Sequence, residues 1–308
     1  LESTPYYHCM SRCVRRAYLC GEDEVTGESY EHRKGWIVSR MKYLSRIFGI
    51  QICAYAVMSN HYHMVLYVDV QRVSKWSDDE VLSRWTTLFP RDGAKLYTLR
   101  ESGACIVEKL EEIRGRLGSI SWYMRAMNEW IARESNLEEG NAGRFWEGRF
   151  KSQALLDEGA VLSAMAYVDL NPIRAGIAKT PEGSDYTSVQ ERIELIGEEP
   201  PKDLMPFKEA DSGLEQIPYE LNDYLILVDE TGRSIRQDKK GHISSNLSPI
   251  LERLQLRPEK WLYMVKSLEK EFTYVVGSQA SLREFSQKQN MRAPKGLAFS
   301  KEMYRLAS

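Results

Sequence analysis

The sequence contains no apolar run close to the roughly twenty residues that a membrane-spanning helix requires. It also opens without an apolar leader of the secretory type, so we expect no membrane partner and a cytoplasmic location. Its five cysteines are an odd number and lack the paired spacing of a disulfide framework. That pattern favours free thiols in a reducing compartment.

The chain also lacks a strong net charge and the common nucleotide-binding motifs. A formal net charge of -2 excludes a protein that is basic throughout. The sequence has no phosphate-binding loop, G-x-S-x-G elbow or dinucleotide fingerprint, which argues against the enzyme classes that depend on them. The average charge hides local differences, because residues 33–46 contain five basic residues and no acidic one.

Apolar and aromatic residues are plentiful. The 308 residues are 43% hydrophobic and include 7 Trp and 17 Tyr, which predicts a folded protein with a sizeable core. A Pro-rich and acidic stretch at 196–206 is the best linker candidate. We therefore expect a domain at 1–200, with an insertion at about 71–115, and a helical accessory region at 201–308 that helps to hold DNA.

Hydrophobic periodicity predicts an α+β fold. Residues 36–48 have helical spacing, whereas 50–58 and 61–69 are apolar runs joined by two residues, as in an antiparallel hairpin. We expect a ferredoxin-like antiparallel sheet with helices on one face, plus a C-terminal helical region. The predicted order is strand, helix, two strands, helix and strand, at 5–13, 36–48, 50–58, 61–69, 120–135 and 151–157.

Two histidines, His61 and His63, interrupt the second strand of this hairpin. Alternation along a strand places both on one face, with Tyr62 and Met64 on the other, packed under the helices. Two imidazoles on one face suit a metal ion, and Mg or Mn is favoured if phosphate oxygens complete its shell. The alternative is a pair of ordinary histidines, because H-x-H by itself is a weak signal. A zinc site at His8, Cys9 and Cys13 is disfavoured because no second half of such a motif follows.

Four stretches resemble the REP-associated tyrosine transposases, single-tyrosine enzymes of the histidine-hydrophobe-histidine superfamily. They are YYHCMSR, YAVMSNHYHMVLYV, GRFWEGRFKS and AYVDLNPIRAGI, and together they cover most of residues 5–178.

The resemblance implies a ferredoxin-like fold, a divalent metal on His61 and His63, and a tyrosine that attacks single-stranded DNA. Position by position, Ile131 stands where the nucleophilic tyrosine is expected, and Asn136 stands at the downstream asparagine, a candidate third ligand. Isoleucine has no nucleophilic atom. Tyr123 is a substitute nucleophile only if the helix register differs.

Basic residues in three places predict contacts with DNA phosphates: the acid-free helix face at 33–46, the GRFWEGRFKS stretch with its interleaved aromatic rings, and the position after the helix stop at 171–172. The alternatives are a solvated helix face, a helix-to-strand connection with buried aromatic rings and solvated arginines, and a simple turn. The candidates are Arg40, Lys42, Arg46, Arg144, Arg149, Lys151 and Arg174.

The function that these features favour is a transposase-like endonuclease or strand transferase, which acts on single-stranded or hairpin DNA ends with a divalent metal. The alternative is a domesticated DNA-binding protein of the same fold without strand transfer. A metal-stabilised structural protein is a weaker third reading. A homodimer is possible.

Overall fold

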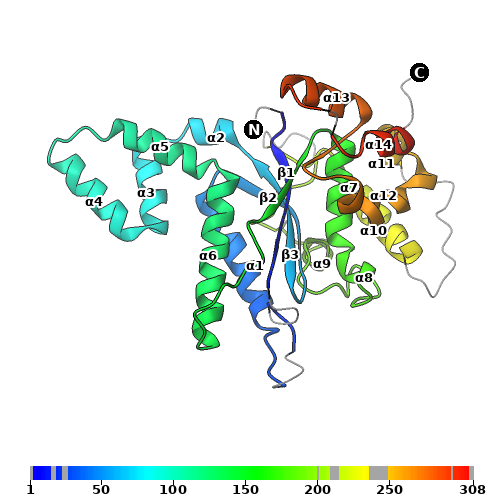
Figure 1. The fold of residues 1–308 in the computed structure, drawn as a ribbon, viewed down its shortest axis with the longest axis horizontal. Helices are drawn as coiled ribbons and strands as arrows, with labels where there is room; N and C mark the ends of the chain where they lie inside the picture. Colours follow the sequence, from blue (N-terminus) through cyan, green and yellow to red (C-terminus); the bar gives the residue numbers. More distant parts are fainter. Residues whose placement is uncertain are drawn as a thin grey trace.

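A five-stranded sheet forms the centre of the protein (Figure 1). The computed structural model describes residues 3–14, 19–22, 27–199, 201–208, 215–235, 249–292 and 294–304. The sheet has the order β2-β3-β1-β4-β5, and its strands are β1 (Tyr6–Arg12), β2 (Ile50–Val57), β3 (His61–Val68), β4 (Lys151–Leu155) and β5 (Val275–Val276). The first four pair antiparallel, and β5 adds to β4 in parallel. The predicted α+β class is confirmed.

Two long helices cover one face of this sheet. They are α1 (Arg33–Ile47) and α6 (Ile120–Glu138), which also pack on each other. In α1, the side chains of Ile37, Met41 and Leu44 are spaced four and three apart, so they form one apolar stripe. This stripe is fully buried in a cluster that includes Tyr62 and Met64 of β3. The helix spacing in the sequence therefore identified the covered face correctly.

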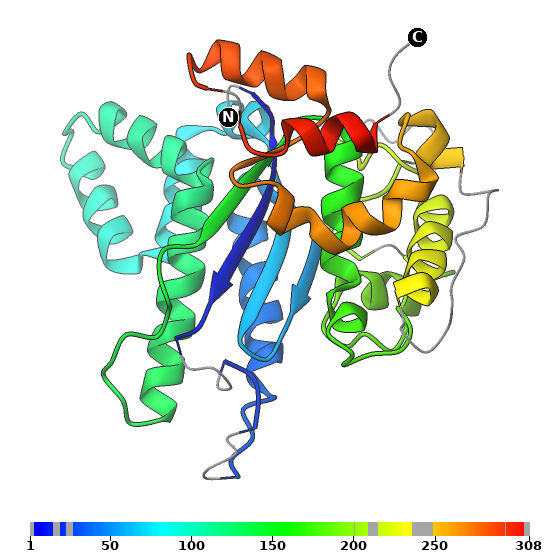
Figure 2. The ribbon, with the colours of Figure 1, turned by 45° about the vertical axis from the view of Figure 1, so that its right-hand side comes forward.

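The opposite face is covered by α7 (Glu158–Asp169) and by helices from the last third of the chain. Every residue of α7 from Gly159 to Asp169 is buried, because the helix lies between the sheet and α12 (Pro258–Glu271). Small residues in α7, among them Ala160 and Ala164, allow these neighbours to approach closely. Figure 2 shows α12 crossing this side of the sheet.

One continuous core joins the last third of the chain to the strands. The buried cluster on the α7 side extends from Cys53 to Met303 and includes β5. Part of the expected linker belongs to it, since Met205 is buried and donates its backbone N–H to the Ile52 carbonyl of β2 at 2.8 Å. The remaining described helices around this core are α8 (Asn171–Arg174), α9 (Ser188–Glu194), α10 (Leu221–Ile235), α11 (Pro249–Arg253), α13 (Gln279–Lys288) and α14 (Leu297–Met303).

The segment between β3 and α6 folds into helices that project to one side of the sheet (Figure 1). They are α2 (Val70–Ser74), α3 (Asp78–Leu88), α4 (Pro90–Glu101) and α5 (Val107–Leu117). Among the described residues, no helix combines the length and apolar character needed to cross a lipid bilayer.

Candidate metal centre and basic surroundings

The side chains of His61 and His63 lie on the same face of β3. Their ring centroids are 4.9 Å apart. Their neighbours by alternation, Val65 and Tyr67, belong to the buried cluster on the α7 side, whereas Tyr62 belongs to the cluster under α1 and α6. Strand alternation thus gives β3 one face with the histidines and another that anchors two helices.

A third histidine comes from the neighbouring strand. His8 of β1 is paired with Val65 of β3, so its ring lies on the same sheet face as that of His63. Nε2 of His8 is 2.9 Å from Nδ1 of His63, and the two rings stack with centroids 5.2 Å apart. Both side chains are almost fully buried. Alternation also explains why Cys9 is not part of this group, because it points into the cluster on the opposite face.

Gln153 of β4 fixes the orientation of the His8 ring. Its amide Nε2 donates to the Phe272 carbonyl at 3.1 Å, which identifies Oε1 as the atom that faces His8. Oε1 lies 2.8 Å from Nδ1 of His8, so Nδ1 must be the protonated nitrogen and donate. The lone pair of His8 then lies on Nε2, the atom that points toward His63.

Glu269 of α12 completes the candidate metal-binding group. Its Oε1 is 3.4 Å from Nδ1 of His63, and the ligand atoms of His8, His63 and Glu269 all lie within 4.8 Å of one another. Two ligands bound at about 2.1 Å to one ion, at right angles, are about 3 Å apart, so the His8–His63 distance fits a shared ion. Two imidazoles and a carboxylate are a suitable donor set for a divalent transition metal.

The histidines at this site are neutral at pH 7. Burial lowers the pKa of His8, although Glu269 and Gln153 oppose the shift, and burial with the neighbouring histidines takes the pKa of His63 well below its usual value. Burial and the nearby Arg12 lower the pKa of His61 to about 4. A neutral imidazole keeps the lone pair that a metal ion needs. His61 lies beside this group but outside it, with Nδ1 2.5 Å from Oδ1 of Asn60.

Several cations surround the histidines. The Arg174 guanidinium lies 3.8 Å from the centroid of the Tyr167 ring, and that ring contacts the rings of both His8 and His63. A 240 Å³ cavity has His8, Gln153, Glu269 and Lys151 in its wall. A second cavity, of 420 Å³, is lined by Arg174 and Lys266 among others. No pattern in the sequence indicated that Arg12 or Lys266 belongs to a site.

Two predicted site residues of α6 are not brought to the histidines. Tyr123 is completely buried on the other side of the sheet, where its hydroxyl donates to the Met41 carbonyl at 2.9 Å. Asn136 donates its amide to the Gly143 carbonyl at 3.0 Å. Both lie away from the histidines for one reason: α6 packs on the face that carries Tyr62, so its residues are separated from His63 by the sheet.

The predicted cations of α1 make contacts within the protein. Lys42 pairs with Glu191 at 2.5 Å, and Arg46 makes two 2.6 Å hydrogen bonds to the carboxylate of Asp203. Arg40 donates to the Ala126 carbonyl at 3.2 Å. The basic face of this helix thus holds neighbouring segments, and it lies on the side of the sheet away from the histidines.

The GRFWEGRFKS segment packs its aromatic rings inside the protein, and its contacts with DNA stay a prediction. Phe145 is buried, and the indole N–H of Trp146 donates to the Asn128 carbonyl at 2.9 Å, so these rings pack inside the protein. Arg144 bonds to backbone carbonyls of its own segment, including that of Trp146 at 2.9 Å. Arg149 is exposed, and Lys151 reaches the cavity beside His8.

Two candidate ligands, His8 and Glu269, were not predicted from the sequence, and they differ in whether the sequence held a signal for them. His8 lies on a predicted strand, and alternation along that strand points its side chain to the face away from Cys9. If the sequence had shown that this strand pairs with the strand of His63, His8 would have been identified. Glu269 lies 206 positions after His63 on a helix with no motif, and only folding brings the two together.

No protein-family model matches the chain, and no curated protein matches it. Among solved structures, the chain is similar to a REP-associated tyrosine transposase bound to a REP hairpin, with 12% sequence identity and a TM-score of 0.38. The match covers 70% of this chain and 93% of the other. A likeness at this level carries no argument about activity, which has to come from the site itself.

Proposed function

We propose that this chain is a transposase-like DNA-processing protein that holds a divalent metal ion between His8, His63 and Glu269 and binds DNA around it. The observation that carries the proposal is the convergence of three ligand atoms within 4.8 Å, with Arg174 and Lys151 close by. Cations beside a metal group suit a phosphodiester substrate, since they contact the phosphate oxygens. The motif resemblance supports single-stranded or hairpin DNA as the form bound.

Each group has a distinct part in this proposal. When bound, the ion would supply polarisation of the phosphodiester and stabilise the charge that builds on its oxygens. Mn fits the two imidazoles and one carboxylate better than Mg, because Mg prefers an all-oxygen shell. Gln153 keeps His8 in the tautomer with a free Nε2. Arg174 and Lys151 orient the DNA backbone.

The second candidate function is DNA binding without strand transfer. It is favoured by the burial of Ile131 and Tyr123 on the far face of the sheet, which leaves no α6 hydroxyl beside the histidines. The tyrosine that does contact them, Tyr167, is itself buried, and burial raises its pKa. Hydrolysis by water would need no tyrosine and would leave no covalent adduct.

The test is an assay with end-labelled hairpin DNA, the 308-residue chain and either MnCl2 or EDTA. We expect Mn-dependent cleavage that falls by at least about 100-fold in His63→Ala, which removes a ligand, and in Glu269→Gln, which removes the negative charge of another. His32→Ala is the matched control, since this exposed histidine pairs with Glu138 and lies outside the site.

The outcomes separate the candidates. A protein–DNA adduct that survives denaturation identifies a tyrosine nucleophile, and cleavage without an adduct indicates water. Binding that weakens steeply with salt, without cleavage, supports the second candidate. Cleavage that is unchanged in His63→Ala contradicts the metal site, and absence of binding at low salt contradicts both functions.

A further inference from the structure

The 420 Å³ cavity near the histidines lies where α8, the end of α10 and α12 meet. Its wall is formed by Asn171, Arg174, Ala175, Ile235 and Lys266. Two of these side chains are cationic, and among the described residues that line the cavity none carries a carboxylate. The volume falls at the lower end of the range of small-molecule sites. A wall of this composition favours an anion.

Both cations are accessible to a ligand. Lys266 is exposed, and Arg174 is partly exposed. Within the part of the chain that the structure describes, neither forms an ion pair with a carboxylate. The Arg174 guanidinium is held by a hydrogen bond from Nη1 to the Tyr167 carbonyl at 3.2 Å. The two positive charges are therefore available to a group that enters from solvent.

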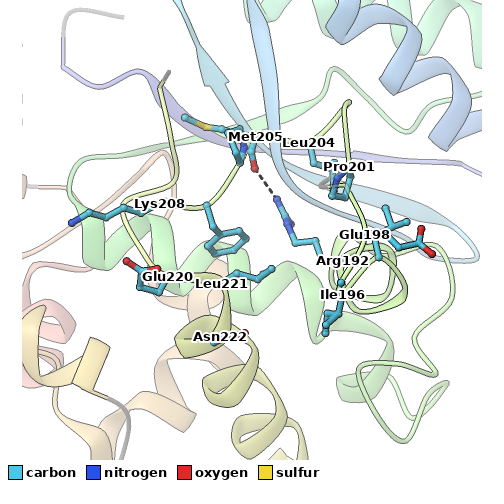
Figure 3. A pocket seen from close by; sticks show the side chains of 14 residues that line it. Arg192, Ile196, Glu198, Pro201, Leu204, Met205, Lys208, Glu220, Leu221 and Asn222 are labelled. Atoms are coloured by element: carbon cyan, nitrogen blue, oxygen red, sulfur yellow. Dashed lines mark hydrogen bonds between the residues drawn. The ribbon is translucent and has the colours of Figure 1, made fainter. Parts of the chain in front are cut away.

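Burial distinguishes these cations from the arginine of another cavity. A 360 Å³ cavity between α9, the segments 195–199 and 201–208 and the start of α10 is lined by Arg192 (Figure 3). The side chain of Arg192 is only 3% exposed, and Nη2 donates to the carbonyls of Cys53 at 2.9 Å and Met205 at 3.2 Å. This guanidinium joins α9 to the edge of the sheet, so its role is structural.

Two contacts place the cavity of Arg174 and Lys266 next to the metal-binding group. Lys266 lies three residues before Glu269 on α12, a rise of about 4.5 Å along the helix. The Arg174 guanidinium lies 3.8 Å from the centroid of the Tyr167 ring, and that ring contacts the His63 ring with centroids 5.7 Å apart. Phosphates of one stacked DNA strand follow one another at about 3.4 Å of axis, and further apart in an extended strand. A strand with one phosphate at the ion thus brings a neighbouring phosphate to the cavity.

We propose that this cavity binds the backbone phosphate next to the one at the metal ion, so that the chain holds two neighbouring phosphates of one DNA strand. This inference rests on the DNA-processing function proposed above. The Lys266 ammonium and the Arg174 guanidinium each donate a charge-assisted hydrogen bond to the phosphate oxygens. Contacts with two successive phosphates fix the register of the strand against the ion.

The first test measures DNA binding without metal, by fluorescence anisotropy with the 308-residue chain in EDTA and a hairpin that carries a single-stranded extension. Lys266→Ala should bind about tenfold more weakly, as for the loss of one charge-assisted hydrogen bond. The slope of log affinity against log salt should become shallower by about 0.7. Lys266→Arg should retain most of the affinity. Lys260→Ala is the matched control on the same helix, since Lys260 pairs with Glu302 at 3.8 Å outside the cavity.

Metal binding separates this inference from the proposed function. Lys266→Ala should not lower the affinity for MnCl2 in titration calorimetry, because Lys266 is not a ligand and its loss removes a positive charge near the ion. A fall in Mn affinity would mean that Lys266 acts through the metal site, and would overturn the assignment. If the wild type binds hairpin DNA and Lys266→Ala binds it equally well, only this inference fails. If the wild type does not bind at low salt, the proposed function fails with it.

Neutral linkages locate the phosphate. Methylphosphonates that replace single phosphates along the extension remove one charge at a time. One position should weaken wild-type binding by about tenfold and have little effect on Lys266→Ala, because that variant has already lost the contact. If no linkage behaves in this way, or if Lys266 affects only DNA with a terminal 5′-phosphate, the cavity does not hold a backbone phosphate.

Discussion

At the scale of single residues, Gln153 decides which nitrogen of His8 is available. Its amide bridges two groups, the ring N–H of His8 and the carbonyl of Phe272, and it is 6% exposed. Residues that hold a ligand in place in this way commonly contribute 10–100-fold to metal affinity. Neither the H-x-H motif nor the family resemblance pointed to this residue.

Replacing Gln153 therefore tests the metal site without touching a ligand. In Gln153→Leu, His8 loses the acceptor that fixes its tautomer, and we expect Mn affinity to fall by about 10–100-fold. Gln153→Glu keeps an acceptor for Nδ1 and should retain most of the affinity. Titration calorimetry with MnCl2 measures both. Wild-type Mn affinity in Gln153→Leu would show that His8 is not a ligand.

At the scale of elements, Asp157 joins the start of α7 to the segment after β5. One oxygen caps α7 by accepting from the Ala160 N–H at 2.9 Å. The other accepts from the Ser278 N–H at 2.6 Å and from the Ser281 hydroxyl at 2.8 Å. Asp157 is thus a structural connection between two helices.

Asp157→Ala should destabilise the protein more than the loss of an ordinary helix cap. We expect a loss of about 2–4 kcal/mol in the free energy of unfolding, because a cap and hydrogen bonds to a second segment disappear together. Ser77→Ala is the control, since Ser77 only caps α3 through the Glu80 N–H and should cost about 1 kcal/mol. Urea denaturation measures both. Equal losses would mean that the link to Ser278 contributes little.

At the scale of the whole molecule, the sheet separates two environments. The face under α1 and α6 is an apolar core that contains Ile131 and Tyr123, and the face under α7 and α12 holds the histidines. The family resemblance implied a tyrosine at position 131. In this fold, a hydroxyl at position 131 would point into the apolar core under α1 and α6, on the side of the sheet away from the histidines.

Ile131→Tyr therefore should not restore covalent attack. The larger side chain overfills a position that is 1% exposed, so we expect about 1–3 kcal/mol of destabilisation and no protein–DNA adduct at residue 131. Leu137→Tyr, on the same helix and 77% exposed, should change stability little. Denaturing gel electrophoresis after incubation with hairpin DNA detects an adduct, and its appearance in Ile131→Tyr would contradict this arrangement.

Much of the fold could be predicted from local pattern. The helical spacing of Ile37, Met41 and Leu44 and the alternation on either side of His63 depend on neighbouring residues alone, so both elements and their buried faces were readable. The two-residue connection after β2 likewise predicted the hairpin, which the structure closes with the Met58 N–H bonded to the His61 carbonyl at 2.8 Å.

The composition of the site was decided by tertiary structure. The sequence determined that His61 and His63 share a face, because alternation is a property of any strand. Strand order determined that His8 joins His63, and the packing of α12 determined that Glu269 does so. Such contacts depend on which segments cover each face of the sheet. The packing of the whole core determines this, because no stretch of neighbouring residues contains the information.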